Sequence, residues 1–170
     1  MSDWIVRAEN GDTDIAGVRA VNLAAFPTAE EADLVDALRL DRVAWIPGLS
    51  MMAVTAHGDC VAHALITRGF IDGHPIANLA PCAVRPDHQR RGVGTTTIEA
   101  VLAAAARLGE NLVTVLGHPE YYPRFGFVPA SRFEVRAPIQ VPEEAMMAMS
   151  LRPGEPVPQG VITYPAPFGI

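Results

Sequence analysis

Residues that could bind a phosphate are concentrated between Arg85 and Thr95. This segment reads R-P-D-H-Q-R-R-G-V-G-T and contains three arginines and two glycines. Guanidinium groups pair well with phosphate oxygens, and Gly92 and Gly94 let the backbone approach a ligand closely. Free N–H groups at the start of a following helix would attract the same anion. The residue types alone therefore predict a site for a phosphorylated ligand.

The flanking sequence indicates which elements position this loop. Residues 76–84 form an apolar run that predicts a strand, and Pro86 ends it because proline lacks an N–H. Residues 95–108 are rich in alanine, with apolar residues three and four apart, which predicts a helix. The segment is thus a strand, an anion-binding loop and a helix.

The spacing of the glycines distinguishes between known phosphate-binding patterns. A P-loop requires a lysine that is absent here, and a dinucleotide fingerprint requires a glycine where Thr97 stands. Residues 89–94, Q-R-R-G-V-G, instead match Q/R-x-x-G-x-G/A, and here the chain resembles the GCN5-related N-acetyltransferase (GNAT) superfamily. The resemblance implies that the loop holds the pyrophosphate of acetyl-CoA and that the preceding strand pairs with the pantetheine arm.

The same resemblance extends to a second motif, Y-Y-P-R-F-G-F at residues 121–127. Many members of the family have a short helix ending in Y-x-x-x-G-F here, packed against the thiol end of the coenzyme. The coenzyme contacts that the resemblance implies are Cys82, Ala83, Val84, Gln89, Arg90, Arg91, Gly92, Val93, Gly94, Thr95, Tyr122 and Phe125.

Acetyl transfer to an amine requires a polarised thioester carbonyl and a proton for the departing thiolate. A backbone N–H at Val84 or its neighbours can hydrogen-bond the carbonyl oxygen as negative charge develops. Tyr122 is the candidate general acid, because a tyrosine with a free pKa of about 10 is protonated at neutral pH. The alternative for Tyr122 is packing beneath the coenzyme, and Tyr121 could serve in either role.

The sequence leaves the general base open. Glu30, Glu31 and His118 are candidates, although a capping box at Thr28–Glu31 would explain one of the glutamates. Cys82 could be read as an acyl-cysteine nucleophile, but a strand cysteine without a His/Asp partner is more typical of a small buried residue. We therefore expect direct transfer in a ternary complex, and we expect no metal site.

The order of the elements predicts an α/β (α+β) fold, a single domain over residues 1–170. A mixed, mostly antiparallel sheet should contain one parallel strand pair, which the resemblance implies to splay apart. The flanking helices should include residues 12–26 and a second helix that starts at the Thr28–Glu31 capping box and continues through Leu40. After residue 127 we expect strands at 133–136, 145–151 and 161–164. Residues 152–170 should form an extension packed on the same domain.

Composition restricts the partners and the compartment. The net charge is −6, so the arginines of the loop form a local basic patch on an acidic protein, which argues against a nucleic-acid partner. The two cysteines are too few for a disulfide scaffold, and no export signal or membrane span is evident. We expect a cytoplasmic protein, and leave a homodimer open.

Two functional hypotheses follow. The first is an N-acetyltransferase that uses acetyl-CoA as co-substrate and a small-molecule or peptide amine as acceptor. The second is a non-catalytic sensor or regulatory module that binds acyl-CoA on the same fold, because fold alone does not determine activity. Only the first hypothesis requires Tyr122 and an open acceptor cleft.

Overall fold

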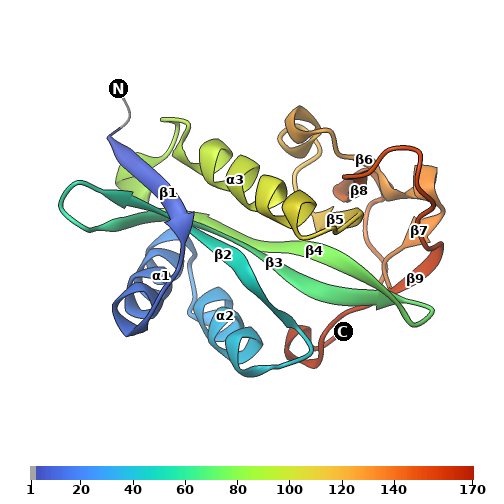
Figure 1. The fold of residues 1–170 in the computed structure, drawn as a ribbon, viewed down its shortest axis with the longest axis horizontal. Helices are drawn as coiled ribbons and strands as arrows, with labels where there is room; N and C mark the ends of the chain where they lie inside the picture. The colour runs from blue at the N-terminus through green and yellow to red at the C-terminus, as the bar shows by residue number, and fades with distance from the viewer. Residues whose placement is uncertain (1–2) are drawn as a thin grey trace.

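The computed structural model describes residues 3–170, so the first two residues of the predicted 1–170 domain lie outside the described part. A nine-stranded sheet is flanked by helices on both faces (Figure 1). The strands are β1 (Trp4–Ala8), β2 (Trp45–Thr55), β3 (Cys60–Ile71), β4 (His74–Val84), β5 (Leu112–Leu116), β6 (Val128–Pro129), β7 (Val135–Arg136), β8 (Met146–Ser150) and β9 (Gly160–Thr163). The helices are α1 (Asp12–Ala25), α2 (Glu30–Leu40) and α3 (Val93–Arg107), with 3-10 turns η1 (Pro86–His88), η2 (Tyr122–Phe125), η3 (Ala130–Phe133), η4 (Glu143–Ala145) and η5 (Ala166–Phe168).

The predicted mixed sheet is confirmed. Its strand order is β1-β2-β3-β4-β5-β8-β6, and β1 to β4 form an antiparallel meander. Gly58 and Gly73 have positive φ values of 87° and 79° in the two hairpin turns, which favours glycine. Strand β5 runs parallel to β4, because α3 carries the chain back across the sheet between them.

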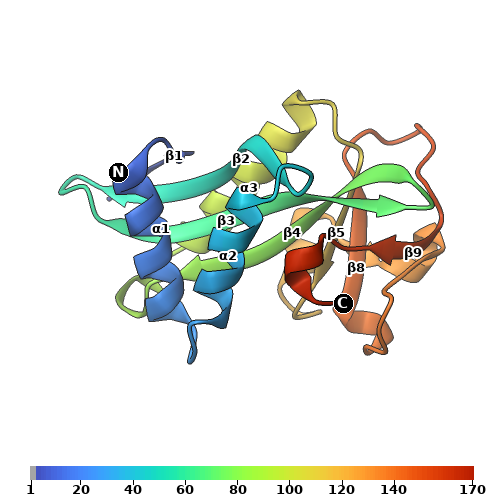
Figure 2. The ribbon, with the colours of Figure 1, turned by 90° about the horizontal axis from the view of Figure 1, so that it is seen from below.

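The helices divide between the two faces of the sheet (Figures 1 and 2). Helix α3 buries Ile98 and Val101 against one face, which includes Leu79 of β4. Helices α1 and α2 cover the other face, where Val18 and Leu38 form part of a second apolar cluster. No helix within residues 3–170 combines the length and the apolar character needed to cross a bilayer.

The start of α2 differs from the prediction. The predicted capping box at Thr28–Glu31 is wrong: α2 begins after Ala29, and no side chain caps it. The Thr28 hydroxyl accepts a hydrogen bond from the Glu30 N–H at 3.4 Å, one position outside the helix start. The carboxylate of Glu31 is therefore not needed for capping.

The parallel strands β4 and β5 are paired over only three residues, Ala77–Leu79 with Val113–Val115. Directly after this contact β4 contains one extra residue relative to β3, which is a β-bulge between Leu79 and Cys82. Strand β4 stays paired with β3 up to Val84, but beyond Leu79 it has no strand partner on the β5 side among residues 3–170. The two strands thus separate, as expected.

The C-terminal segment packs back onto the sheet. Strand β9 pairs with the end of β3 through Ile71↔Ile162, and it also runs parallel to β7. Ile162 is 1% exposed and joins a separate apolar cluster with Ile76 and Met146. The strands expected at 145–151 and 161–164 are confirmed as β8 and β9. Strand β7 is shorter than expected because η3 occupies the residues before it.

Candidate functional site

A groove of about 550 Å³ lies between the end of β4, the start of α3 and the η2 turn. We call it the central groove. Phe26, at the end of α1, contributes to a further side. The predicted coenzyme residues that line it are Cys82, Ala83, Val84, Gln89, Arg90, Gly92, Gly94 and Thr95.

Backbone geometry at the start of α3 suits an anion. Gly92 is the N-cap with φ 85°, and no side chain caps the helix, so the first N–H groups keep their hydrogen-bonding capacity. Gly94 lies against β4: a Cβ there would come within 2.8 Å of Val84 Cγ2. The absence of a side chain at this position therefore keeps the groove open beside the free N–H groups.

The three arginines of the loop occupy different environments. Arg85 forms an ion pair with Asp87 at 2.7 Å, which together with His88 lowers the Asp87 pKa to about 2. Arg91 pairs with Asp3 at 3.1 Å on the surface. Arg90 alone lines the central groove. The expectation that all three guanidinium groups face one ligand is therefore too broad, because two of them have carboxylate partners of their own.

Four residues that the resemblance assigns to the coenzyme do not line the central groove. Arg91 faces Asp3, and the side chain of Val93 is 1% exposed within an apolar cluster. Phe125 lines a neighbouring hollow with Met149. Tyr122 lies deeper, beside Cys82.

Tyr122 is held in a mostly apolar setting. Its ring packs on Gly117, where an added Cβ would come within 2.4 Å of Tyr122 Cε2. It also packs edge to face with Phe127, the ring centroids being 5.9 Å apart. The Tyr122 hydroxyl lies against the Cys82 thiol. Burial raises the pKa of Tyr122, with a smaller contribution from Cys82, so the phenol keeps its proton.

Cys82 stands where β4 leaves β5 and lines the central groove. Burial raises the pKa of its thiol to about 12. A thiol with so high a pKa is a poor nucleophile at neutral pH. Cys60, the second free cysteine, likewise has its pKa raised by burial, to about 11.

Two further residues line the groove: Tyr121, which the sequence analysis named as an alternative to Tyr122, and Arg124, which it did not name. The hydroxyl of Tyr121 lies 3.0 Å from Thr95 Oγ1, and Arg124 lines the groove next to it. The second motif marks both positions. Nothing in the sequence indicates that Tyr121, rather than Tyr122, faces the groove, since that depends on how the η2 turn is oriented.

The candidate bases lie apart from the central groove. His118 is 83% exposed at its side chain and faces Glu120 at 3.8 Å on the surface. Glu30 and Glu31 line a smaller hollow of about 270 Å³ between α2 and the η5 turn, together with Phe168. None of the three side chains lines the central groove, although the His118 carbonyl accepts a hydrogen bond from the Tyr122 N–H at 3.3 Å, so the base stays unassigned.

A buried polar chain connects α1 to the sheet. His63 accepts a hydrogen bond from Asn22 at 3.2 Å and donates one to Ser50 at 2.8 Å. Ser50 donates to Glu9, which is paired with Arg39 at 3.0 Å. Burial, reinforced by the charge of Arg39, lowers the pKa of His63 to about 3. We assign this chain a structural role.

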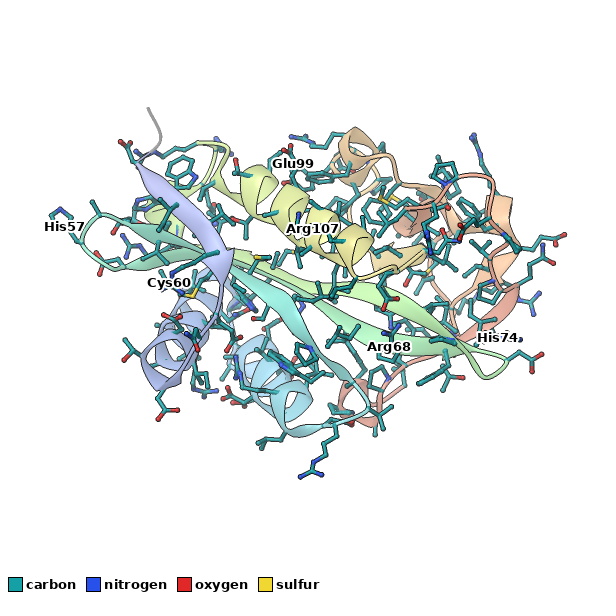
Figure 3. The ribbon with its side chains drawn as sticks, in the orientation of Figure 1. His57, Cys60, Arg68, His74, Glu99 and Arg107 are labelled. Atoms are coloured by element: carbon teal, nitrogen blue, oxygen red, sulfur yellow. The ribbon has the colours of Figure 1, made fainter. Side chains whose placement is uncertain are left out.

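Within residues 3–170 no group of three or more His, Cys, Asp or Glu side chains is placed to hold a metal ion. Polar residues on the outer surface, such as His57 at a hairpin tip and Glu99 on α3, are separate from the groove (Figure 3).

The sequence is similar to those of known acetyltransferases. Residues 49–129 match a family model described as an acetyltransferase (GNAT) domain. The uncharacterized N-acetyltransferase YjhQ of Escherichia coli (strain K12) is 39% identical over 137 residues, which cover 78% of this chain and 75% of that protein. YhbS of the same organism, also described as an uncharacterized N-acetyltransferase, is 26% identical over 125 residues, 72% of this chain and 73% of that protein.

Solved structures show the same fold. YhbS from Escherichia coli in complex with CoA aligns with a TM-score of 0.89 at 23% identity, over 100% of this chain and 94% of that one. A GNAT family acetyltransferase from Brucella melitensis in complex with acetyl-CoA aligns with a TM-score of 0.78 at 27% identity, over 97% of both chains. Given these alignments and the 39% identity with YjhQ, the chain belongs to the GNAT family of N-acetyltransferases.

Proposed function

We propose that this protein transfers the acetyl group of acetyl-CoA directly to a primary amine, within a ternary complex. The observation that supports the proposal is the central groove. It extends from the free N–H groups at the start of α3 to the part of β4 that has no strand partner on the β5 side. This arrangement provides an anion site at one end and a strand edge at the other. The Brucella melitensis relative holds acetyl-CoA in the same fold.

The reaction requires stabilisation of charge at two atoms. As the amine attacks, the thioester carbonyl oxygen becomes negative, and a backbone N–H near Cys82 to Val84 donates a hydrogen bond to it. When the carbon–sulfur bond breaks, the departing thiolate takes a proton from Tyr122 in this proposal. The attacking nitrogen releases one proton to solvent, and the phenolate regains one from solvent, so the protons balance. The raised pKa of Tyr122 keeps the proton available at neutral pH.

Direct transfer is preferred to an acyl-cysteine intermediate. A Cys82 nucleophile would have to ionise, and its pKa of about 12 opposes this. Its neighbour is the Tyr122 phenol, which is not a base at neutral pH. In this proposal the Cys82 side chain therefore lines the groove and does not act as a nucleophile.

A non-catalytic acyl-CoA sensor is the competing function, and both hypotheses require coenzyme binding. The buried Tyr122 phenol at the strand gap favours the enzyme. We place the protein in the cytoplasm, because its two cysteines are free, which suits a reducing compartment. Dimerisation stays open.

The test measures release of CoA thiol from acetyl-CoA in the presence of a panel of primary amines, including polyamines, amino sugars and peptides. The enzyme hypothesis expects amine-dependent release for at least one of them. The Tyr122→Phe variant should lower kcat by about 10²- to 10⁴-fold while acetyl-CoA binding, followed by calorimetry, is retained. Full kcat in this variant across the pH range would remove Tyr122 as the acid. Binding without any turnover across the panel would favour the sensor.

A further inference from the structure

Two arginines from different elements line the central groove. Arg90 belongs to the loop before α3, and Arg124 belongs to the η2 turn. Arg85 and Arg91, their neighbours in the loop, are each paired with a carboxylate. Neither Arg90 nor Arg124 has an ion-pair partner within residues 3–170. The groove therefore has uncompensated positive charge from both elements.

Arg124 is held in place by its neighbour Tyr121. Its Nε donates a hydrogen bond to the Tyr121 carbonyl at 2.8 Å, and its guanidinium carbon lies 4.1 Å from the centre of the Tyr121 ring. Such a cation over an aromatic face is attracted to the ring. The terminal nitrogens of Arg124 donate no hydrogen bond to residues 3–170. Their N–H groups are therefore available to a ligand.

Tyr121 in turn connects this arginine to the anion site. Its hydroxyl lies 3.0 Å from Thr95 Oγ1, in the first turn of α3. The ring thus spans from the N–H groups of that turn to the guanidinium group of Arg124. The position of Arg124 relative to the anion site is fixed by two contacts of one rigid side chain, which reduces the entropy lost when a ligand binds.

We propose that Arg124 binds a phosphate of the coenzyme from the η2 turn, and that Tyr121 is its positioning residue. This inference rests on the proposed use of acetyl-CoA. A guanidinium group presents parallel N–H donors that match phosphate oxygens. The N–H groups of α3 and Arg90 serve one phosphate, and Arg124 serves either the second phosphate of the diphosphate or the 3′-phosphate of the ribose.

Glu99 is a possible alternative partner for the Arg124 guanidinium group. Arg124 also lines the neighbouring hollow, together with Glu99. No ion pair joins Arg124 to Glu99 in the structure. If that carboxylate were its true partner, removing the charge of Arg124 would leave coenzyme affinity unchanged.

The experiment compares calorimetric affinities for CoA and for 3′-dephospho-CoA in the full-length protein. Arg124→Gln removes the charge, and Arg107→Gln is the matched control, because Arg107 is exposed at the far end of α3, roughly 20 Å along the helix axis (Figure 3). We expect Arg124→Gln to weaken CoA binding roughly 10- to 100-fold and Arg107→Gln to change it less than about twofold.

The two ligands identify which phosphate is bound. If Arg124 binds the 3′-phosphate, the loss disappears with 3′-dephospho-CoA; if it binds the diphosphate, the loss is the same with both ligands. Either result supports the proposal. Equal affinity of Arg124→Gln and the control for CoA would overturn it. Both proteins must show the same circular dichroism spectrum.

Variants of Tyr121 test its positioning role. Tyr121→Phe keeps the ring over Arg124 but loses the contact with Thr95, whereas Tyr121→Leu loses the ring as well. We expect the loss caused by Arg124→Gln to shrink at least severalfold in the Tyr121→Leu background. An undiminished loss would show that Arg124 acts without Tyr121. Failure of the wild type to bind CoA would refute both proposals, whereas binding without acetyl transfer would refute only the enzyme.

Discussion

Next to the central groove, the Tyr122 phenol and the Cys82 thiol keep their protons for the same reason. Both are withdrawn from water, which disfavours the phenolate and the thiolate alike. A protonated phenol next to the strand gap can donate to a thiolate, while a protonated thiol is inert. The same burial therefore makes Tyr122 a proton donor and leaves Cys82 unreactive.

Sequence reasoning could find only part of the site at this scale. The contiguous loop residues from Gln89 to Thr95 follow one local pattern, so their type and spacing were enough to predict the anion site. Arg124 was missed, and Tyr121 could not be distinguished from Tyr122, because their contribution depends on the direction in which the η2 turn faces. The contacts that connect Glu9, Ser50 and His63 join three distant parts of the chain and leave no local pattern.

The buried His63 makes the free energy of unfolding depend on pH. Its folded pKa of about 3 lies below the unfolded value of about 6.5, so the unfolded chain binds the extra proton and stability falls as pH falls through this window. Between pH 7 and pH 4.5 we expect a loss of roughly 2–3 kcal/mol from this residue. Urea unfolding at both pH values measures it. In His63→Gln the loss should be smaller by that amount, and an unchanged loss would contradict the assignment.

At the scale of elements, the site depends on how α3 begins and how β4 ends. Pro86 and the glycines marked the strand, loop and helix correctly. The capping box failed because Thr28 lies one position too early, and a shift of one residue is below what a side-chain pattern can resolve. The separation of β4 from β5 was expected only from the family resemblance, and the β-bulge after Leu79 was not predicted.

Gly94→Ala tests the close approach of α3 to β4. The new Cβ would lie 2.8 Å from Val84 Cγ2, so either the helix start or Val84 must move and the groove narrows. We expect acetyl-CoA affinity to fall about tenfold or more, equivalent to about 1.4 kcal/mol. Thermal stability should change little, because alanine favours a helix by about 1 kcal/mol over glycine. Thr96→Ala, on the exposed side of the same turn, is the control; equal affinities of the two variants would contradict the prediction.

At the scale of the whole molecule, several apolar clusters hold the chain together. One lies between α3 and the central strands, another lies under α1 and α2 on the opposite face, and a third gathers residues of β3, β4, β5 and β8 around β9. The sequence predicted the strands of the C-terminal part from their composition. Their partners were not predictable, because β9 pairs with a strand about 90 residues earlier and short edge strands carry no pairing signal.

Neighbouring residues of β9 test whether this segment contributes to the core. Ile162 is 1% exposed and Val161 is 40% exposed. Ile162→Ala should lower the free energy of unfolding by about 2–5 kcal/mol, while Val161→Ala should change it by less than about 0.5 kcal/mol. Chemical denaturation measures both. Similar values for the two variants would mean that β9 is not packed as described.

The separation of β4 from β5 also affects how the protein behaves towards other chains. An unpaired strand edge on the outside of a protein is a template for aggregation. Here the open edge lies inside a groove, shielded by the end of α1 and by Tyr121. A second polypeptide, with its bulky side chains, has poor access to it. A narrow, flexible ligand can enter. The fold therefore keeps the backbone N–H and C=O groups of this β4 edge available to such a ligand without exposing the molecule to self-association.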